Sequence, residues 1–195
     1  MNSLPELILA STSPYRKELL ARLSIPFKCV SPEIDEDSFK KDNPSPFLLA
    51  KKLAYAKAEK VFKTHPSAYV IGGDQVLAFN DIVFGKPGTE KIAMDQLLQL
   101  QGKTHQLITS VCLLTPQTTI EFSNIATMTM RNLTKEQIAT YIRKDQPLNC
   151  CGSYKLESLG ISLFEQIDCD DHTAIIGIPL LKLTDYLLIN DFKIL

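Results

Sequence analysis

The first third of the chain alternates between two hydrophobic periods, and this alternation limits the folds that it can adopt. Residues 6–10, ELILA, form an apolar run of strand length, and residues 14–23, PYRKELLARL, have the spacing of a short helix. A second strand pattern, FKCVS, follows at 27–31. Strands that alternate with helices are typical of proteins in which helices cover a sheet. The sequence therefore predicts an α/β fold.

The rest of the chain continues this alternation with longer elements. Residues 46–62 predict an alanine-rich helix that begins at proline, and residues 68–79 predict a strand that turns at Asn80-Asp81 into another strand. We expect further helices at 90–100, 135–144 and 180–189, long strands at 104–115 and 118–131, and late strands at 160–167 and 173–177. No internal repeat is visible, so we expect one domain over residues 1–195.

Composition narrows the possible partners. The formal net charge is -1, whereas nucleic-acid binders usually carry a basic excess. The start of the chain has no Lys or Arg before its apolar part, and the longest strongly apolar run, 174–181, is too short to cross a bilayer. Five cysteines without Cys-x-x-Cys spacing predict reduced thiols. We therefore expect a cytoplasmic protein with no nucleic-acid or membrane partner, whose bound anions are small.

The start of the first helix carries a charge that the helix itself does not favour. Ser13-Pro14 is typical of an N-cap and first helical residue, and position N3, where a capping box has Glu or Gln, is Arg16. A cation is unfavourable there because the helix N-terminus is the positive end of the dipole. Either Arg16 is exposed on an ordinarily capped helix, or it forms a phosphate cradle with Ser11 and Ser13.

Three further side chains stand at positions where a charge needs an explanation. Lys57 lies on the apolar stripe of helix 46–62, from which its ammonium either reaches the surface or contacts an anion. Asp74 closes an apolar strand after two glycines, as a catalytic carboxylate at a sheet edge or as a turn residue. Lys86 stands in a Gly/Pro turn before a helix, a place that suits either a phosphate or solvent.

Two clusters of acidic residues and one histidine allow more than one interpretation. The segment PEIDED holds Glu33, Asp35, Glu36 and Asp37, whose oxygens could bind a divalent cation, although most such clusters are solvated. We interpret DCDDH, at 168–172, as a surface turn. His105 is either a substrate contact or, more commonly, a hydrogen-bonded structural residue.

Eight short motifs occur in the order found in the Maf family of nucleoside triphosphate pyrophosphatases, formerly called septum formation inhibitors. They are LASTSPYRKELL, PEIDED, LAYAKA, GGDQV, GKP, GKTHQLITSV, CGSYKLESLGISLFEQI and IIGIPL. The chain resembles this family from residue 7 to about 188. The resemblance implies a two-lobed α/β unit on a long twisted mixed sheet with flanking helices, similar to inosine triphosphate pyrophosphatases, with a cleft between the lobes. It also implies a homodimer.

The resemblance further implies an activity and its residues. Members hydrolyse a nucleoside triphosphate to the monophosphate and pyrophosphate with a divalent metal, Mg²⁺ or Mn²⁺. Asp74 matches the general base, and Arg16, Lys57 and Lys86 match the phosphate-binding cations. Glu36 matches the acidic residue near metal or water, so that Glu36 and Asp74 are the implied metal ligands. The older family name keeps open a nucleotide-binding regulator of cell division without turnover.

Three departures from the commonest family pattern bear on the substrate. Tyr15, Gln75 and Glu157 stand where many members have Arg, Thr and Gln, and they resemble the subgroup that acts on 7-methyl-GTP. N7-methylguanine is cationic, so Tyr15 can stack on it and Glu157 can accept its hydrogen bonds while balancing its charge. Such an enzyme would remove modified nucleotides before they enter nucleic acid. Activity on dTTP, UTP, ITP or XTP with the same fold remains the alternative.

Overall fold

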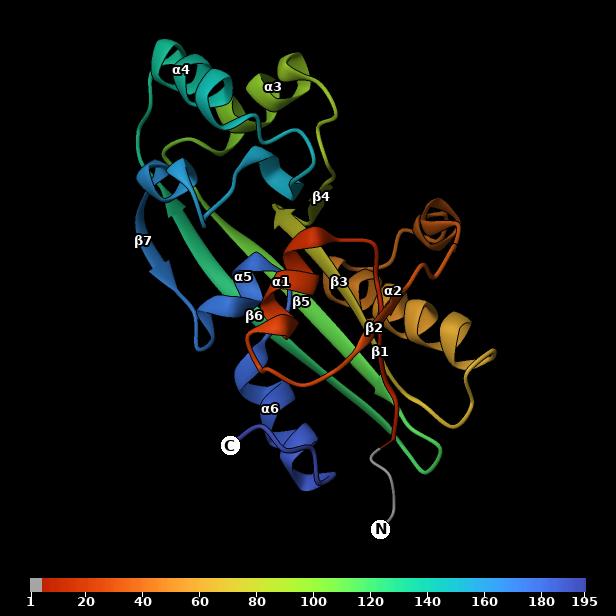
Figure 1. Ribbon diagram of the computed structural model, residues 1–195. Helices are drawn as coiled ribbons and strands as arrows, with labels where there is room; N and C mark the ends of the chain where they lie inside the picture. The colour runs from red at the N-terminus through yellow and green to blue at the C-terminus, as the bar shows by residue number, and fades with distance from the viewer. Residues whose placement is uncertain (1–4) are drawn as a thin grey trace.

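The computed structural model describes residues 5–195, which form a mixed sheet with helices on both faces (Figure 1). The elements in chain order are β1 (Leu7–Ala10), α1 (Pro14–Ala21), β2 (Lys28–Val30), η1 (Glu36–Lys40), α2 (Pro46–Phe62), β3 (Tyr69–Phe79), β4 (Ile82–Phe84), α3 (Glu90–Leu100), β5 (Thr104–Leu114), β6 (Thr119–Met130), α4 (Lys135–Asp145), η2 (Cys151–Ser153), η3 (Leu159–Leu163), β7 (Phe164–Asp168), α5 (His172–Ile176) and α6 (Leu180–Ile189). The strand order is β2-β1-β3-β5-β6-β7, and β4 also pairs with β3. β1 runs parallel to β2 and β3, whereas the other pairs are antiparallel. The predicted α/β class with a mixed sheet and flanking helices is confirmed.

The long strand β3 changes its neighbour halfway along its length. Residues Tyr69 to Gly72 pair with β1, Leu77 to Phe79 pair with β4, and β5 pairs with most of β3 along the opposite edge. Residues 73–76 therefore have a strand neighbour on one edge only. Asp74 therefore lies inside β3 and does not close a strand as expected, but the sheet is open at this point, so side chains from loops and helices can approach it.

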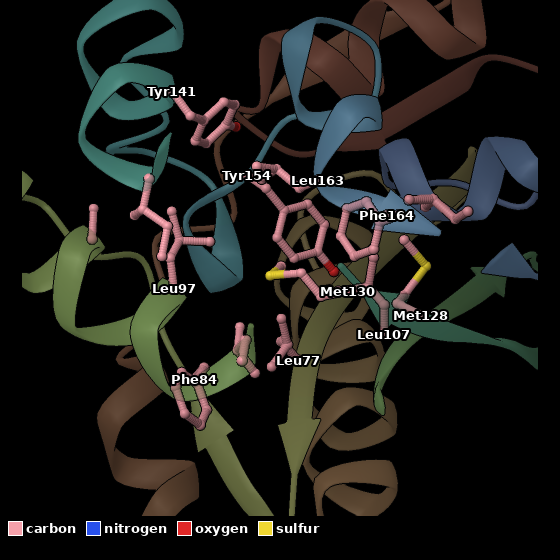
Figure 2. Packing of buried hydrophobic residues seen from close by; sticks show 14 of the residues in the cluster. Leu77, Phe84, Leu97, Leu107, Met128, Met130, Tyr141, Tyr154, Leu163 and Phe164 are labelled. Carbon is pink, nitrogen blue, oxygen red and sulfur yellow. The ribbon is translucent and has the colours of Figure 1, made fainter. Parts of the chain in front are cut away.

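Separate apolar cores lie on the two sides of this opening. One core lies under α3 and α4 and includes Leu77, Leu97 and Phe164 (Figure 2). At the other end of the sheet, Ile71 packs with α1 and α6, whereas Val70 packs with α2. Adjacent strand residues point to opposite faces, so α2 covers one face and α1 with α6 the other. The sheet thus joins two lobes, and residues 73–76 lie between them.

Small residues let α2 approach β3 closely. A Cβ atom at Gly72 would lie 2.2 Å from the carbonyl oxygen of Ala54 and 2.6 Å from the backbone nitrogen of Ala58. Both alanines are buried. Gly72 and Asp74 share a face of the strand because they are two residues apart. The close approach therefore brings Lys57 of α2 over Asp74.

Two late segments differ from the predicted strands. Residues 173–177, TAIIG, form most of helix α5 and its C-cap, because Asp171 caps the helix by accepting a hydrogen bond from the backbone nitrogen of Thr173 at 2.9 Å. This cap overrides the strand preference of the β-branched residues. Of residues 160–167, the first four belong to the 3₁₀ helix η3 and only the rest pair with β6. Asp171 is buried, so DCDDH is not simply a surface turn.

The other elements agree with the prediction to within a few residues. α2 has the predicted bounds, and Thr134 with Gln137 forms the predicted capping box. The five cysteines are free thiols, of which Cys112 is buried and Cys29 is exposed. Within residues 5–195, no helix combines the length and apolar content needed to cross a membrane.

Candidate active site

A cleft of about 630 Å³ opens between the two lobes, at the gap in the sheet. This volume is typical of small-molecule sites. The cleft wall includes all the residues that the sequence analysis assigned to a site: Ser11, Ser13, Tyr15, Arg16, Glu36, Lys57, Asp74, Gln75, Lys86 and Glu157. They come from six separate segments of the chain. The fold thus brings together residues that are up to about 145 positions apart, from Ser11 to Glu157.

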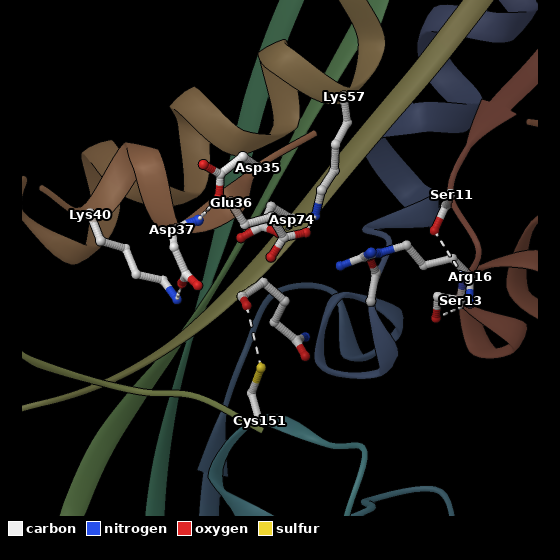
Figure 3. A network of polar contacts seen from close by, with 12 residues as sticks. Ser11, Ser13, Arg16, Asp35, Glu36, Asp37, Lys40, Lys57, Asp74 and Cys151 are labelled. Carbon is white, nitrogen blue, oxygen red and sulfur yellow. Dashed lines mark hydrogen bonds and ion pairs between the residues drawn. The ribbon is translucent and has the colours of Figure 1, made fainter. Parts of the chain in front are cut away.

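A lysine between two carboxylates lies at the floor of this cleft. Lys57 Nζ lies 2.7 Å from Oδ1 of Asp74 and 2.7 Å from Oε1 of Glu36 (Figure 3). Lys57 and Asp74 are each only 6% exposed, whereas half of the Glu36 side chain is accessible. Buried charges are costly unless they are paired. The structure therefore favours the anion-contact interpretation of Lys57 over a lysine that reaches the surface.

The two carboxylates differ in their proton affinity. Burial raises the pKa of Asp74 above its usual value, although Lys57 and Arg16 both oppose this change. Burial also acts to raise the pKa of Glu36, but the hydrogen bond and charge of Lys57, together with Lys86 and Arg16, outweigh it and lower that pKa. Asp74 is thus the better proton acceptor, and Glu36 stays ionised.

Arg16 enters the cleft from the start of α1. Ser13 Oγ caps the helix by accepting from the backbone nitrogen of Arg16 at 3.4 Å, and Ser11 Oγ accepts from the backbone nitrogen of Ser13 at 3.1 Å. Arg16 Nε donates to the carbonyl oxygen of Gly177 at 3.1 Å. The guanidinium points toward Asp74 (Figure 3). Arg16 is therefore not an exposed residue on an ordinary helix, and its charge faces the buried carboxylate.

The three positions that depart from the family pattern lie in different surroundings. Tyr15 is half-buried, and burial together with Cys150 raises its pKa to about 12, so the phenol is neutral. Glu157 lies in an exposed loop of the opposite lobe, where Lys86 is also exposed. The amide nitrogen of Gln75 is turned toward carbonyl oxygens at the end of α5. The ring of Tyr15 and the carboxylate of Glu157 are therefore the two groups of this set that can contact a base in the cleft.

Most of the remaining acidic candidates have local roles. Asp35 caps η1 by accepting from the backbone nitrogen of Asp37 at 3.2 Å, and Asp37 pairs with Lys40 at 2.7 Å. Glu36 is the member of PEIDED that meets Lys57. His105 is buried with Nε2 3.0 Å from the hydroxyl oxygen of Tyr154, which agrees with the structural interpretation.

Sequence reasoning missed several residues of the cleft wall. Lys40, Cys150, Cys151 and Tyr154 all line it. Cys151 Sγ donates to the backbone oxygen of Gln75 at 3.6 Å, which ties this segment to β3. The position of Lys40 after an acidic run was a usable signal. Cys151 and Tyr154 belong to the motif CGSYKLESLGISLFEQI, which carries the family resemblance, but residue type and spacing around 150–154 do not by themselves indicate a cleft.

The donor set at Glu36 and Asp74 fits a divalent metal that also binds a substrate. Lys57 Nζ contacts one oxygen of each carboxylate, Oε1 of Glu36 and Oδ1 of Asp74. In the described part of the chain, the second oxygens, Oε2 of Glu36 and Oδ2 of Asp74, accept no hydrogen bond. Residues 5–195 contain no group of three or more potential metal ligands among His, Cys, Asp and Glu. Mg²⁺ is commonly held by one or two carboxylates, with phosphate oxygens and water completing its shell.

Fold and cleft together define a class: an α/β protein whose cleft holds a buried carboxylate beside arginine and lysine cations, and such cations suit the charge of a phosphorylated substrate. Within this class, the chain belongs to the family described as Maf-like protein, which matches residues 6–189. The predicted family membership is therefore confirmed.

Known relatives extend over most of the chain. A protein named "7-methyl-GTP pyrophosphatase" from a Polaromonas species is 46% identical over 178 residues, which cover 90% of this chain and 80% of that protein. A relative of the same name from Bdellovibrio bacteriovorus is 43% identical over 178 residues, covering 91% of this chain and 93% of the relative. A solved HAM1 protein from Coxiella burnetii aligns with a TM-score of 0.44 and 14% identity over 65% of this chain and 73% of that one.

Proposed function

We propose that this protein hydrolyses 7-methyl-GTP to 7-methyl-GMP and pyrophosphate, and thereby keeps a modified nucleotide out of nucleic acids. The names of relatives that are 40 to 46% identical support this reaction and substrate. The observation that carries the proposal is the buried Asp74 carboxylate, which faces the cleft between Lys57 and Arg16. A protein that only bound the phosphates would not need a buried carboxylate among its cations.

The reaction is a displacement by water at the α-phosphorus. Asp74 accepts a proton from the water as the new oxygen–phosphorus bond forms, which suits a carboxylate whose pKa is raised by burial. The bond from the α-phosphorus to the bridging oxygen breaks, and pyrophosphate leaves with that oxygen. Negative charge grows on the phosphate oxygens, and Arg16 and Lys86, which line the cleft, would stabilise it.

A divalent metal, Mg²⁺ or Mn²⁺, belongs to this proposal. Glu36 and Asp74 would hold it, and when bound it stabilises charge on phosphate oxygens. Lys57 contacts both carboxylates, and its single positive charge offsets part of their negative charge before substrate arrives.

Recognition of the base is assigned to two residues of the cleft wall, Tyr15 at the start of α1 and Glu157 of the opposite lobe. The neutral ring of Tyr15 offers a face for a cationic base, and Glu157 offers acceptors and a balancing charge.

We assign residues 1–195 to one domain and the protein to the cytoplasm, where its free thiols suit a reducing compartment. We also propose a homodimer, because Leu181 and Ile189 of α6 leave apolar side chains 65% and 76% exposed.

Pyrophosphate release tests the proposed reaction. The purified protein is assayed with Mg²⁺ or Mn²⁺ on 7-methyl-GTP, GTP, dTTP, UTP, CTP and ITP. We expect the fastest turnover on 7-methyl-GTP, and a loss of about 100-fold or more in Asp74→Asn, because the amide cannot accept the proton. Binding of the nucleotide by this variant, measured by calorimetry, should persist.

The other outcomes assign the protein differently. Preference for dTTP, UTP or ITP would retain the enzyme and reject the assigned base. Tight binding without release of pyrophosphate from any nucleotide would support the regulator. Near-normal turnover by Asp74→Asn would remove Asp74 from the mechanism.

A further inference from the structure

The side chain of Arg16 lies in a slot whose walls are two glycines. A Cβ atom at Gly177 would lie 3.1 Å from Cγ of Arg16, and one at Gly73 would lie 3.5 Å from its Nε. Nε also donates to the carbonyl oxygen of Gly177 at 3.1 Å. Because this bond uses Nε, the terminal nitrogens remain directed into the cleft (Figure 3). The position of the Gly177 carbonyl therefore sets the direction of the Arg16 charge.

Gly177 is the C-cap of α5, and the last turn of this helix is held by two side chains of the sheet. Thr109 Oγ1 donates to the carbonyl oxygen of Ala174 at 2.8 Å. Gln75 Nε2 lies 2.9 Å from the carbonyl oxygens of both Ala174 and Ile175. Carbonyls at the end of a helix have no partner within the helix and need one elsewhere. Gln75 and Thr109 supply it.

The geometry points to a positioning role for Gln75 and Thr109: they hold the end of α5, and through the Gly177 carbonyl they aim Arg16 at the phosphate chain. This inference rests on the proposed function, in which Arg16 binds phosphate. It replaces the predicted role of Gln75 in reading the base. The amide nitrogen of Gln75 has two N–H donors, and the α5 carbonyls with Thr109 Oγ1 at 3.0 Å already surround it.

The two roles of Gln75 predict different kinetics. If Gln75 read the base, its replacement would change the ratio of activities on 7-methyl-GTP and GTP. If it positions Arg16, its replacement lowers turnover of both nucleotides by the same factor and weakens binding of a phosphate chain that has no base. Inorganic triphosphate is such a probe.

Thr109 offers the sharper variants, because it is 1% exposed and is not among the residues that line the cleft. Thr109→Val keeps the shape and removes the hydroxyl, whereas Thr109→Ser keeps the hydroxyl. We expect Thr109→Val to lower kcat on 7-methyl-GTP and on GTP by about tenfold each, and to weaken inorganic triphosphate binding in calorimetry by a similar factor. Thr109→Ser should stay within about twofold of the wild type in each measurement.

Gln75→Met removes the other side chain that binds the α5 carbonyls. This variant is the only test of the inference if Thr109→Val does not fold. We expect an unchanged ratio of 7-methyl-GTP to GTP turnover with both rates reduced. A changed ratio would overturn the inference. So would a Thr109→Val protein with a lower melting temperature but wild-type kcat and triphosphate affinity, because that result describes a purely structural threonine.

Failure of the proposed function has a separate signature. In that case the wild type would release no pyrophosphate from any nucleotide. The comparison of triphosphate affinity between the wild type, Thr109→Val and Thr109→Ser would still decide whether the two side chains position Arg16.

Discussion

Three neighbouring carboxylates, those of Asp35, Glu36 and Asp37, contact different partners and have different roles. Asp35 caps the turn that follows it, and Asp37 pairs with Lys40 at the surface. Glu36 points to Lys57 and shares its ammonium with Asp74. Only the last arrangement combines burial, opposite charge and access to a cleft. At this scale, the surroundings of a carboxylate rather than its type decide its chemistry.

Replacing the charge of Glu157 tests the assigned recognition of the base. Glu157→Gln keeps the size and hydrogen-bonding capacity but loses the charge that balances a methylated guanine. We expect the kcat/KM ratio of 7-methyl-GTP to GTP to fall about tenfold, the effect of a charge-assisted hydrogen bond becoming neutral. Stability should hardly change, because Glu157 is exposed.

Glu165→Gln is the matched control for this substitution. Glu165 is also exposed, but it lies on β7 and is not among the residues that line the cleft. Glu165→Gln should leave the kcat/KM ratio of 7-methyl-GTP to GTP unchanged. An equal effect of both variants, or none of either, would remove Glu157 from base recognition.

Among the elements, the pair of α2 and β3 does most to build the site. The alanines of α2 and the glycine of β3 allow helix and strand backbones to touch, and this contact sets the height of Lys57 above Asp74. A larger residue at either surface would separate the two charges. The site therefore depends on residues that never contact substrate.

Gly72→Ala tests this dependence. The new methyl group would meet backbone atoms of α2, which no rotation of a side chain can relieve. We expect the free energy of unfolding to fall by about 3 kcal/mol, as in other overpacked cores, and turnover per folded molecule to fall as well. Urea denaturation measures the first effect and pyrophosphate release the second.

Gly85→Ala is the control for stability. A Cβ atom at Gly85 would have no atom within 4 Å, so this variant should unfold at nearly the same urea concentration as the wild type. If Gly72→Ala were as stable as Gly85→Ala, the close approach of α2 and β3 would not be needed.

For the whole molecule, a single sheet joins two lobes with separate apolar cores, and the cleft lies between the lobes. His105 belongs to the core under α3 and α4, where it lies beside the rings of Tyr154 and Phe164. Burial lowers its pKa to about 4. The ring is therefore neutral in the folded protein, whereas in the unfolded chain it takes up a proton below about pH 6.5.

This difference makes global stability fall in acid. As pH falls from about 6.5 towards 4, the unfolded chain binds the proton first, so the free energy of unfolding decreases; above this window His105 has no effect. Between pH 7.5 and 5.0 the loss should be about 2 kcal/mol greater in the wild type than in His105→Gln. Urea denaturation at the two pH values measures it. Parallel losses in both proteins would contradict the assignment.

Local chemistry explains the parts of the fold that were predictable. Proline at the start of α2 and the capping box at Thr134 act within one helical turn, so they can be read from neighbouring residues. An apolar run of strand length likewise predicts β5, and alternating apolar and polar residues predict β6. The motif match also named residues that the fold gathers into one cleft, including Asp74 and Lys57.

Contacts between residues far apart in the sequence account for the features of the fold and of the site that could not be predicted. The cap from Asp171 on the helical segment TAIIG is local, but Gln75 and Thr109, which bind the carbonyl oxygen of Ala174, lie 99 and 65 positions away from it in the sequence. The partners of Lys57, and the direction of the Gln75 amide, likewise depend on residues 17 to 100 positions away. Periodicity and capping describe a few neighbouring residues, whereas such contacts exist only after the lobes have packed. Local sequence thus determined most of the helices and strands, whereas tertiary contacts determined the geometry of the site.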